Sequence, residues 1–563
     1  MHATGKPFLR TTPHDSTVPI AVKGLRKRLA LADPYDWAGA LLLVLLIVLV
    51  AATFSSYAIS NDEEAQQRYG ELILQYYRSG FTDRALFSYG NLYLYGGLFD
   101  VVAVLCEQLL PQVEPYAVRH VLCAICGIAG VGGTFATARL VAGPRAGALA
   151  AVALAVCGPW YGSMFNHTKD IPFAAAMIWA TYFLCCAARD LPRPRWRDVA
   201  LFGLMLGASL GIRVLGLLLI GYVALAIVMR MIQSQPRPMR DHLGFFAESA
   251  FRFGPAFAIG YVIMIAAWPW SALAPLNPVR GLIDFSEFNY QIRTLLNGQI
   301  YMMGDVPRWY VPAYLLIKLP LIMLAGAAVA AVFTAWPGRT SARLSRMRDE
   351  TALLAIIAVF PVLCEVIHRG PAFSGLRHFL FVVPVFAVLA GIGFHWLLMR
   401  LEARRYAIAR IAYGAIAAAL LWNASMLVRL HPYEYLYYNP LVGGLEGASG
   451  RYETDYWVNI MPEAVESLEA YVAKLDADRH HPQRYSVAVC GERVPFEKEA
   501  GTRLRWSEDW KQAEFYIAPT HMNCDRALDG TVISNITRLG VRIGVVKDRR
   551  NLVQPEIARG PKH

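Results

Sequence analysis

The sequence predicts an α-helical polytopic membrane protein with a small extracytoplasmic α/β domain at its C-terminus. Hydrophobic residues make up 56% of the 563 residues and charged residues only 17%, against roughly 25% charged in soluble proteins. The mean hydropathy is +0.36. The apolar residues form runs of about 20, the length that crosses a bilayer core of roughly 30 Å. This composition excludes a disordered chain, a collagen and a disulfide-rich miniprotein.

The net charge fits a membrane protein and indicates no nucleic-acid partner. Its formal value is +12, and cytoplasmic loops of membrane proteins are rich in Lys and Arg. The first apolar run, Trp37–Ile59, is too long for a signal-peptide core. Residues 1–36 are therefore expected to form a cytoplasmic tail before a signal anchor. The tail carries six basic residues: Lys6, Arg10, Lys23, Arg26, Lys27 and Arg28.

The moderately apolar run Leu92–Leu110 is expected to lie along the outer surface as a juxtamembrane helix. If it crossed, the basic loops Arg189–Asp198, Arg339–Arg348 and Arg400–Arg410 would lie outside, against the positive-inside rule. Its Asp100 also suits an interfacial helix, as does Glu107.

Ten further spans bring the expected number to about eleven, which places the C-terminus outside. The membrane module then covers residues 37–429, with long outer loops at 60–116 and 272–311. The later spans are predicted at about 117–139, 146–165, 171–188, 198–213, 215–232, 253–271, 312–335, 351–368, 378–399 and 406–428.

Residues 430–563 are expected to form a compact outer domain. A helical stretch precedes strand-like runs, which is typical of an α/β fold. These segments are Pro462–Leu475, then Tyr485–Cys490, Glu514–Ala518 and Val541–Lys547. Two of the nine cysteines, Cys490 and Cys524, fall in this domain, either as a disulfide or as two buried thiols.

No cofactor is predicted. The sequence shows no metal-ligand spacing, no thioredoxin-like pair and no nucleotide-binding glycine loop. A divalent metal is left open.

Several ionisable side chains lie at the outer ends of the predicted spans. They are Asp62, Glu63, Lys169, Asp170, Arg213, Arg377 and His378, with Lys318 about a turn and a half inside its span. Each of these residues also has a structural explanation when it is taken alone. Asp170 is favourable at the start of a helix, and the cations could reach the lipid headgroups as snorkelling side chains. Together they suit group transfer, because a carboxylate can act as a general base and cations can hold a phosphate. An ionisable group at the depth of Lys318 indicates a function or a partner.

The motifs around these residues resemble the GT-C glycosyltransferases that use polyprenyl-phosphate sugars. The nearest branches are the protein O-mannosyltransferase-like family and the bacterial aminoarabinose transferases of lipid A. The resemblance covers roughly residues 35–430. It is carried by Asp62-Glu63 with Arg68-Tyr69, by Lys169-Asp170-Ile171-Pro172, by the Tyr- and Pro-rich segment Tyr310–Pro320, and by Gly375-Leu376-Arg377-His378-Phe379.

The resemblance implies an inverting hexosyl or pentosyl transferase with a polyprenyl-phosphate-linked sugar as donor. The acceptor would be a lipid, a glycan or a protein, on the outer face. The catalytic residues would be Asp62, Glu63 and Asp170, with Asp62 as the general base and Asp170 positioning the acceptor or supporting the base. Lys169, Arg213, Arg377, His378 and Lys318 would bind the donor phosphate. Tyr310 and Tyr314 would belong to the loop that orders over donor and acceptor.

The sequence also departs from this resemblance. Some relatives carry Glu-Lys-Pro near the end of the first outer loop, where this chain has Phe87–Leu92. The missing Lys leaves Arg84, Arg213 or Arg377 as replacements. The segment His431–Trp457 looks like a feature of a bacterial branch, so a bacterial inner membrane is expected, with the C-terminal domain periplasmic. No role is assigned to that segment.

Three alternative functions remain. A transporter or flippase for lipid-linked sugars would show internal repeats and ionisable groups near mid-membrane. A non-catalytic scaffold would leave Lys318 and the two acidic sites without a purpose. A phosphoethanolamine transferase would need a metal-bound nucleophile, for which no ligands are seen.

Overall fold

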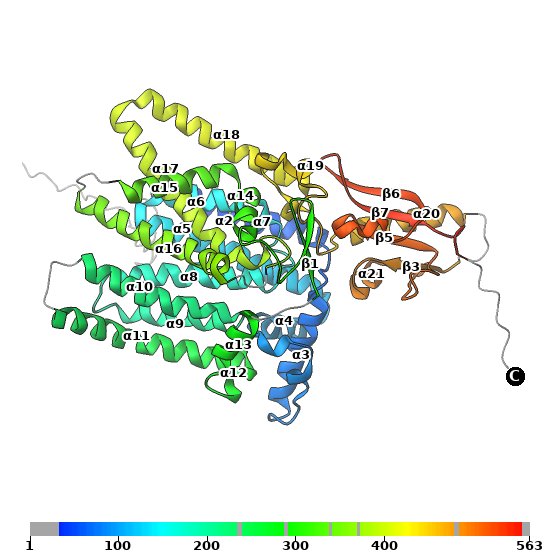
Figure 1. Cartoon of the computed structure of the whole chain (residues 1–563), viewed down its shortest axis with the longest axis horizontal. Coiled ribbons are helices and arrows are strands. Elements are labelled where there is room, and N and C mark those ends of the chain that lie inside the picture. Colours follow the sequence, from blue (N-terminus) through cyan, green and yellow to red (C-terminus); the bar gives the residue numbers. More distant parts are fainter. Residues whose placement is uncertain are drawn as a thin grey trace, which may run out of the picture.

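The computed structural model describes residues 33–233, 239–286, 291–336, 341–368, 372–477 and 483–553. A long helical body carries a small sheet domain at one end (Figure 1). Most of the predicted tail 1–36 and part of the basic loop Arg339–Arg348 lie outside the described residues.

The predicted fold class is confirmed. In the described residues, eight helices are long and apolar enough to cross a membrane, or nine if one bent pair counts as a span. Their helical segments are α2 (Pro34–Thr53), α5 (Pro115–Ala142), α8 (Asp170–Arg189), η4–α10 (Val214–Leu217 and Leu218–Gln233), α11 (Met239–Ala267), α16 (Ala342–His368), η5–α17 (Arg377–Val382 and Val383–Arg404) and α18 (Tyr406–Leu430).

Three of the expected spans differ from the prediction. Helices α6 (Pro144–Ala155) and α9 (Trp196–Leu210) occupy two of them but have only 12 and 15 residues. The expected span 312–335 is a bent pair, α14 (Tyr310–Lys318) and α15 (Leu321–Ala335), with 113° between them. The break follows from Pro320, which disfavours helical backbone at the residue before it; Leu319 is extended, with ψ 142°.

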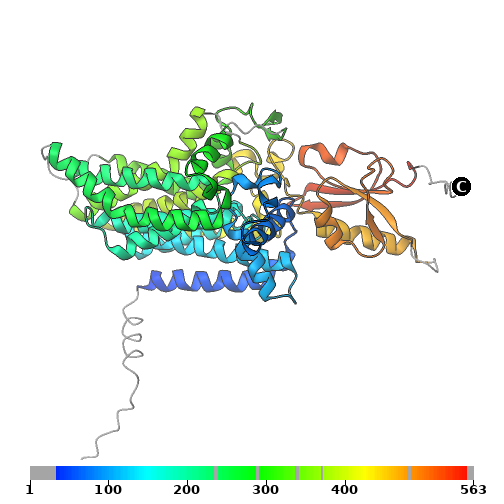
Figure 2. The ribbon, with the colours of Figure 1, turned by 90° about the horizontal axis from the view of Figure 1, so that it is seen from below.

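Small residues allow the central helices to pack closely. Helix α17 packs against α5, α6, α15 and α16. A Cβ at Gly391 would lie 2.4 Å from the carbonyl oxygen of Ala146, and one at Gly393 would lie 2.1 Å from that of Gly326. Such contacts are typical of membrane helix packing. By contrast, α2 runs along one edge of the body (Figure 2) and is mostly exposed, as a lipid-facing helix would be.

Helices α3 (Glu63–Arg78) and α4 (Leu98–Leu109) lie at the end of the body next to the sheet domain (Figure 1). With 12 residues, α4 is about 18 Å long, too short to span a membrane, as predicted for that run. Its Asp100 does not face water, however, because it is buried in an ion pair with Arg119 at 2.7 Å. The second long loop contains α12 (Pro269–Leu273), α13 (Asn277–Ser286) and the antiparallel hairpin β1–β2 (Arg293–Leu296 and Gln299–Met302).

The C-terminal domain is a five-stranded mixed sheet in the order β4-β3-β5-β7-β6. The strands are β3 (Tyr485–Val489), β4 (Leu504–Trp506), β5 (Phe515–Pro519), β6 (Thr531–Arg538) and β7 (Val541–Asp548), with α20 (Met461–Leu475) packed on β6 and β7 and with α21 (Arg493–Glu499) packed on α20 and next to β4. The predicted helix and three strands are present, and β4, β6 and α21 are additional. Cys490 and Cys524 form a disulfide, with 6.3 Å between their Cα atoms.

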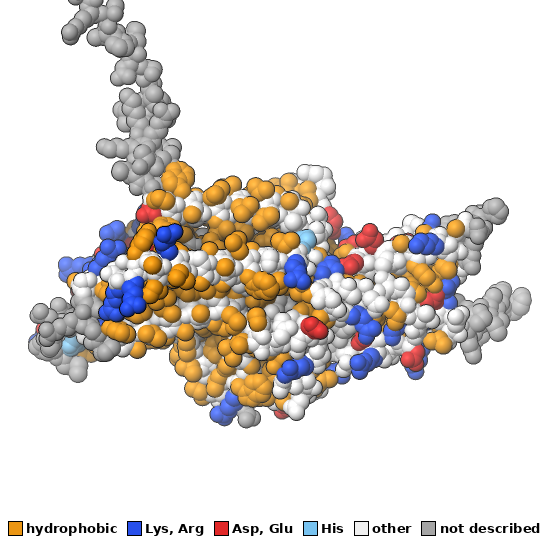
Figure 3. Space-filling model, turned by 90° about the horizontal axis from the view of Figure 1, so that it is seen from above, with side chains coloured by type: hydrophobic (Ala, Val, Ile, Leu, Met, Phe, Trp, Pro, Cys, Tyr) orange, Lys and Arg blue, Asp and Glu red, His pale blue; other side chains and the backbone are white. Residues whose placement is uncertain are grey.

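Short helical turns complete the described chain: η1 (Phe54–Ser56), η2 (Ala85–Ser88), η3 (Leu92–Leu94), α7 (Gly158–Tyr161), η6 (Glu434–Leu436), η7 (Pro440–Val442), α19 (Gly444–Ala448) and η8 (His521–Arg526). Figure 3 shows hydrophobic side chains over the helical body and Lys and Arg gathered at the end away from the sheet domain.

Candidate functional site

Two carboxylates and two guanidinium groups from four separate segments meet at the end of the body that faces the sheet domain. Asp62 lies on the turn before α3, Asp170 begins α8, Arg213 precedes η4 and Arg377 begins η5. Arg377 bridges the two acids: its Nη2 donates to Asp62 Oδ2 and its Nε to Asp170 Oδ2 at 3.2 Å. Arg213 Nη2 donates to the other oxygen of Asp170. The structure thus joins four of the residues singled out from the sequence.

The two carboxylates differ in access. The side chain of Asp62 is 39% exposed and that of Asp170 only 3%. Burial by itself would raise the pKa of Asp62, but the charges of Arg377 and Lys169 outweigh it and hold the pKa below its usual value. Asp62 is therefore an ionised and partly exposed carboxylate, whereas Asp170 is enclosed between two arginines.

Lys169 supplies a cation that no protein anion neutralises directly. Its side chain is buried, and its Nζ lies 4.4 Å from the ring centroid of Tyr95. Within the part of the chain that the structure describes, no hydrogen bond or ion pair joins this ammonium group to another residue. Burial lowers the pKa of Lys169. A buried cation that forms no ion pair among the described residues is stabilised by an anionic ligand.

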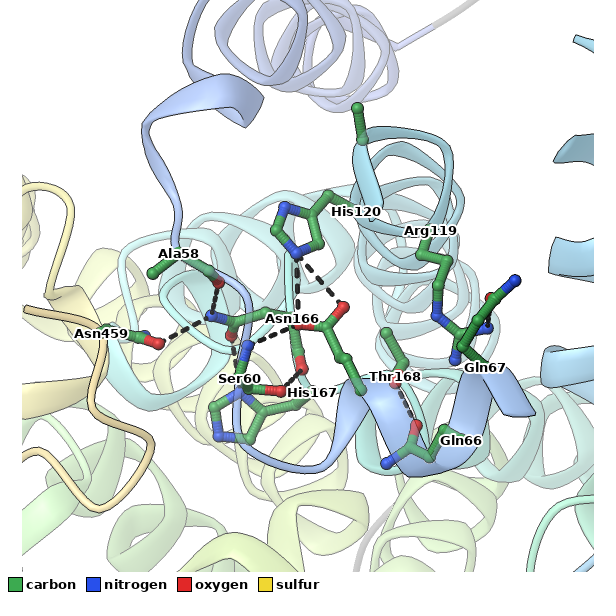
Figure 4. Close-up of polar contacts among 12 residues, drawn as sticks. Ala58, Ser60, Gln66, Gln67, Arg119, His120, Asn166, His167, Thr168 and Asn459 are labelled. Carbon is green, nitrogen blue, oxygen red and sulfur yellow. Dashed lines mark hydrogen bonds and ion pairs between the residues drawn. The ribbon is translucent and has the colours of Figure 1, made fainter. Parts of the chain in front are cut away.

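The loop that carries Lys169 is held by a dense polar network (Figure 4). Asn166 Nδ2 donates to the carbonyl of Ala58 at 3.0 Å, and Ser60 Oγ donates to the carbonyl of Asn166 at 3.2 Å. Thr168 Oγ1 donates to Gln66 Oε1. These bonds fix the turn that carries Asp62 against the turn that carries Lys169 and Asp170.

Glu63 faces away from the bridged carboxylates. Its side chain is fully buried, and its Oε2 accepts a hydrogen bond from the Ser60 N–H at 2.7 Å. Its Oε1 lies 3.2 Å from Nε2 of His120 on α5. In this geometry Glu63 holds the Asp62 turn and is closed to a substrate.

Trp457 is a site residue whose role was not predicted from the sequence. The guanidinium carbon of Arg377 lies 4.1 Å above its ring centroid. Its indole Nε1 donates to His167 Nε2 at 2.6 Å, while His167 Nδ1 lies 3.1 Å from Asn166 Oδ1. Burial lowers the pKa of His167 to about 3, so the ring is neutral. The segment His431–Trp457 therefore supplies the aromatic ring on which the guanidinium group of Arg377 stacks.

Lys318, Tyr310 and Tyr314 lie in a neighbouring region. Lys318 is buried; its Nζ donates to the carbonyl of Tyr435 at 2.9 Å and lies 3.8 Å from the ring centroid of Tyr438. The Tyr310 hydroxyl accepts from the Gly375 N–H at 2.9 Å and bonds to Thr294 of β1 at 2.6 Å. The Tyr314 hydroxyl donates to the carbonyl of Leu295. The two tyrosines thus fasten the β1–β2 hairpin to the bundle.

His378 and Arg84, the two remaining candidates for binding the donor phosphate, lie in different surroundings. His378 follows Arg377 directly and makes an edge contact with the ring of Phe373, with centroids 4.5 Å apart. Arg84, considered as a replacement for the missing lysine, is exposed and stacks on Phe87 at 5.4 Å.

Val214, the residue after Arg213, lines an apolar cavity. It encloses about 800 Å³, counting space open to solvent, and its walls come from η4, α10, α13 and α16. The lining residues are Val214, Leu215, Leu217, Leu218, Gly221, Tyr222, Leu225, Leu282, Ile356 and Phe360. An apolar cavity of this size beside a cationic centre suits a lipid with an anionic head.

No group of three or more His, Cys, Asp or Glu side chains could hold a metal ion within the residues that the structure describes.

Comparison with known proteins supports the resemblance seen in the sequence. Residues 112–246, about a quarter of the chain, match the family described as dolichyl-phosphate-mannose-protein mannosyltransferase. This match confirms the similarity to GT-C glycosyltransferases. No curated protein matches the chain in sequence.

Two solved structures are similar over most of the chain. ArnT from Cupriavidus metallidurans bound to undecaprenyl phosphate is 15% identical, with a TM-score of 0.49, covering 93% of this chain and 100% of that one. The archaeal oligosaccharyltransferase AglB from Archaeoglobus fulgidus, in complex with an inhibitory peptide and a dolichol-phosphate, is 12% identical, with a TM-score of 0.45, covering 86% of this chain and 69% of that one.

Proposed function

We propose that the protein is an inverting membrane glycosyltransferase that moves a monosaccharide from a polyprenyl-phosphate carrier to a hydroxyl group of a lipid, glycan or protein. The observation that carries this proposal is the bridge of Arg377 between a reachable carboxylate, Asp62, and an enclosed one, Asp170. This arrangement supports the proposal, because a partly exposed carboxylate can act as a general base and the cations beside it suit a phosphate leaving group.

In the proposed reaction, the acceptor hydroxyl attacks the anomeric carbon of the sugar and its proton passes to Asp62. A new C–O bond forms while the bond from the anomeric carbon to the phosphate oxygen breaks, with inversion. Polyprenyl phosphate leaves with the electron pair and one additional negative charge. Lys169 and Arg213, together with Arg377, neutralise that charge. No nucleotide takes part.

The other residues have supporting roles in this proposal. Asp170 holds Arg213 and Arg377 in place, and Glu63 positions the Asp62 turn through Ser60 and His120. His378 lines the same region. The apolar cavity beside Arg213 would hold the first isoprene units of the carrier. Donor and acceptor would meet on the outer face, because the Lys- and Arg-rich loops lie at the opposite end of the body and favour a cytoplasmic position there.

The test is a transfer assay with purified protein and radiolabelled polyprenyl-phosphate monosaccharides, with and without membrane extract as acceptor. Asp62→Asn is expected to reduce turnover roughly 10²- to 10⁴-fold while donor binding persists. Asp36→Asn is the matched control, since Asp36 pairs with Arg139 at 2.6 Å at the other end of α2. Full turnover by Asp62→Asn would refute the base assignment. Donor binding without consumption by the wild type would favour a transporter or lipid-sugar receptor.

A further inference from the structure

Lys318 is a buried cation that the proposed transfer reaction does not use. Its side chain is only 5% exposed, and it lies within the bent helix pair α14–α15. Among the described residues, its ammonium group forms no ion pair; it donates to one carbonyl, that of Tyr435, and lies over one ring, that of Tyr438. An ammonium group has three hydrogen-bond donors. Burying such a group in a membrane protein costs free energy, so its presence indicates a function.

Lys318 lines a small cavity that also touches the proposed centre. The polar side chains that line it include those of Lys318, Arg377, Ser163, Glu453 and Tyr456. Arg377 also contacts both carboxylates, so the cavity adjoins the position proposed for the phosphate. The cavity encloses about 300 Å³, counting space open to solvent.

Two of these groups have unused hydrogen-bonding capacity. The Glu453 side chain is 2% exposed; its Oε1 accepts from the Leu295 N–H at 2.7 Å and from Thr294. Its Oε2 lies 3.1 Å from Nδ1 of His521 but accepts no well-aligned hydrogen bond. The hydroxyl of Ser163, a buried residue, has no hydrogen-bond partner in the described chain. Buried polar groups without partners are rare, and a ligand can satisfy them.

We propose that this cavity receives the sugar ring of the donor, with Lys318 and Ser163 donating hydrogen bonds to ring hydroxyls and Glu453 accepting from them. This inference rests on the proposed function and assigns Lys318 to the sugar rather than to the phosphate. The ligand class is a neutral, hydroxyl-rich monosaccharide. One ammonium and one carboxylate group match the donor and acceptor sides of hydroxyls, whereas a charged ring would meet a like charge.

Occupation of this cavity is coupled to the second outer loop. The cavity has room for about one water molecule, so the surrounding side chains must separate to admit a ring. Glu453 holds β1 through Thr294 and Leu295. A sugar hydrogen-bonded to Glu453 therefore contacts the residue that holds the β1–β2 hairpin beside the site.

The test compares the affinity of the full-length protein for polyprenyl phosphate with its affinity for polyprenyl-phosphate monosaccharides. The variants are Lys318→Met, Glu453→Gln and Ser163→Val. Ser249→Val is the matched control, because Ser249 is also a fully buried serine without a side-chain partner, on α11 outside the lining of this cavity. Thermal unfolding and size-exclusion chromatography identify any variant that does not fold. Ser163→Val, the mildest of the three changes, keeps the test valid if the charged positions are required for folding.

We expect Lys318→Met and Glu453→Gln to weaken binding of the sugar-carrying lipid roughly ten- to hundredfold, with binding of bare polyprenyl phosphate unchanged. Ser163→Val should also reduce the preference for the sugar-carrying lipid over bare polyprenyl phosphate. Ser249→Val should leave that preference unchanged. An equal loss for both lipids in Lys318→Met would place Lys318 at the phosphate and overturn the inference. A wild type that binds both lipids equally would also overturn it. A wild type that binds neither lipid and transfers no sugar would refute the proposed function itself.

Discussion

Replacing Arg377 by Lys tests whether the bridge between the two carboxylates is the centre of the site. A lysine keeps the positive charge but presents one point of contact instead of a planar fork. Arg377 donates to both Asp62 and Asp170 and stacks on Trp457 at 4.1 Å. Arg377→Lys can keep one of these carboxylate bonds, and it loses the planar stacking.

The expected loss follows from these contacts. One charge-assisted hydrogen bond contributes about 1.5–3 kcal/mol, and a cation–π contact about 0.5–2 kcal/mol. A total of about 2–5 kcal/mol corresponds to roughly 30- to 5,000-fold in rate. Because Asp62 is 39% exposed, water replaces part of the lost bond. We therefore expect kcat/KM to fall about 30- to 300-fold.

The assay is sugar transfer at limiting donor concentration, with donor binding measured in parallel. Arg189→Lys is the matched control, because Arg189 makes a two-point contact with Glu350, at 2.6 and 2.7 Å, at the other end of α8. It should retain kcat/KM within about threefold of the wild type, as expected for a change outside the reacting groups. If Arg377→Lys retains more than a third of the wild-type value, the bridge is not the catalytic centre.

Three further changes test other parts of the structure. Lys169→Met removes one of the charges that lower the pKa of Asp62, so the acidic limb of the kcat/KM profile should move to higher pH; an unchanged profile would separate Lys169 from the base. Gly162→Ala would place a Cβ 2.1 Å from a backbone nitrogen of the segment that follows α18, so the variant should lose about 1–3 kcal/mol of stability and unfold at a lower temperature; unchanged stability would contradict this close approach. Cys490→Ser opens a loop with a sequence separation of 34 and should cost about 3–4 kcal/mol, seen as faster proteolysis of the C-terminal domain; Cys524→Ser should match it, and equal resistance to protease would refute the stabilising role.

The sequence was sufficient for the membrane architecture because apolar runs and loop charges act locally. Each run near 20 residues forms a helix with internally satisfied backbone groups. The prediction failed where a local feature overrides the run, as at Pro320, which divides one expected span into α14 and α15. It also missed that Asp100 pairs with Arg119 rather than facing water, because a buried ion pair needs a partner from another helix.

The candidate site was only partly predictable. The sequence selected Asp62, Asp170, Arg213 and Arg377 by residue type and expected sidedness, and the structure brings these four together. It also selected Glu63, which faces His120 instead. Successive residues at a helix start point in different directions, so the sequence pair alone could not decide which carboxylate faces the site.

What the sequence determined by itself is most of the membrane-spanning helices, the outer domain with most of its strands, and the charged groups that one end of the bundle would hold. Tertiary structure alone decided which of these groups touch. Trp457 lies 80 residues beyond Arg377 in the chain, yet its ring lies under that guanidinium group. Lys318 faces a cavity shared with Glu453 rather than an ion-pair partner. The physical reason is that hydropathy is a property of each segment, whereas hydrogen bonds and stacking depend on distances between segments that only the packed chain fixes.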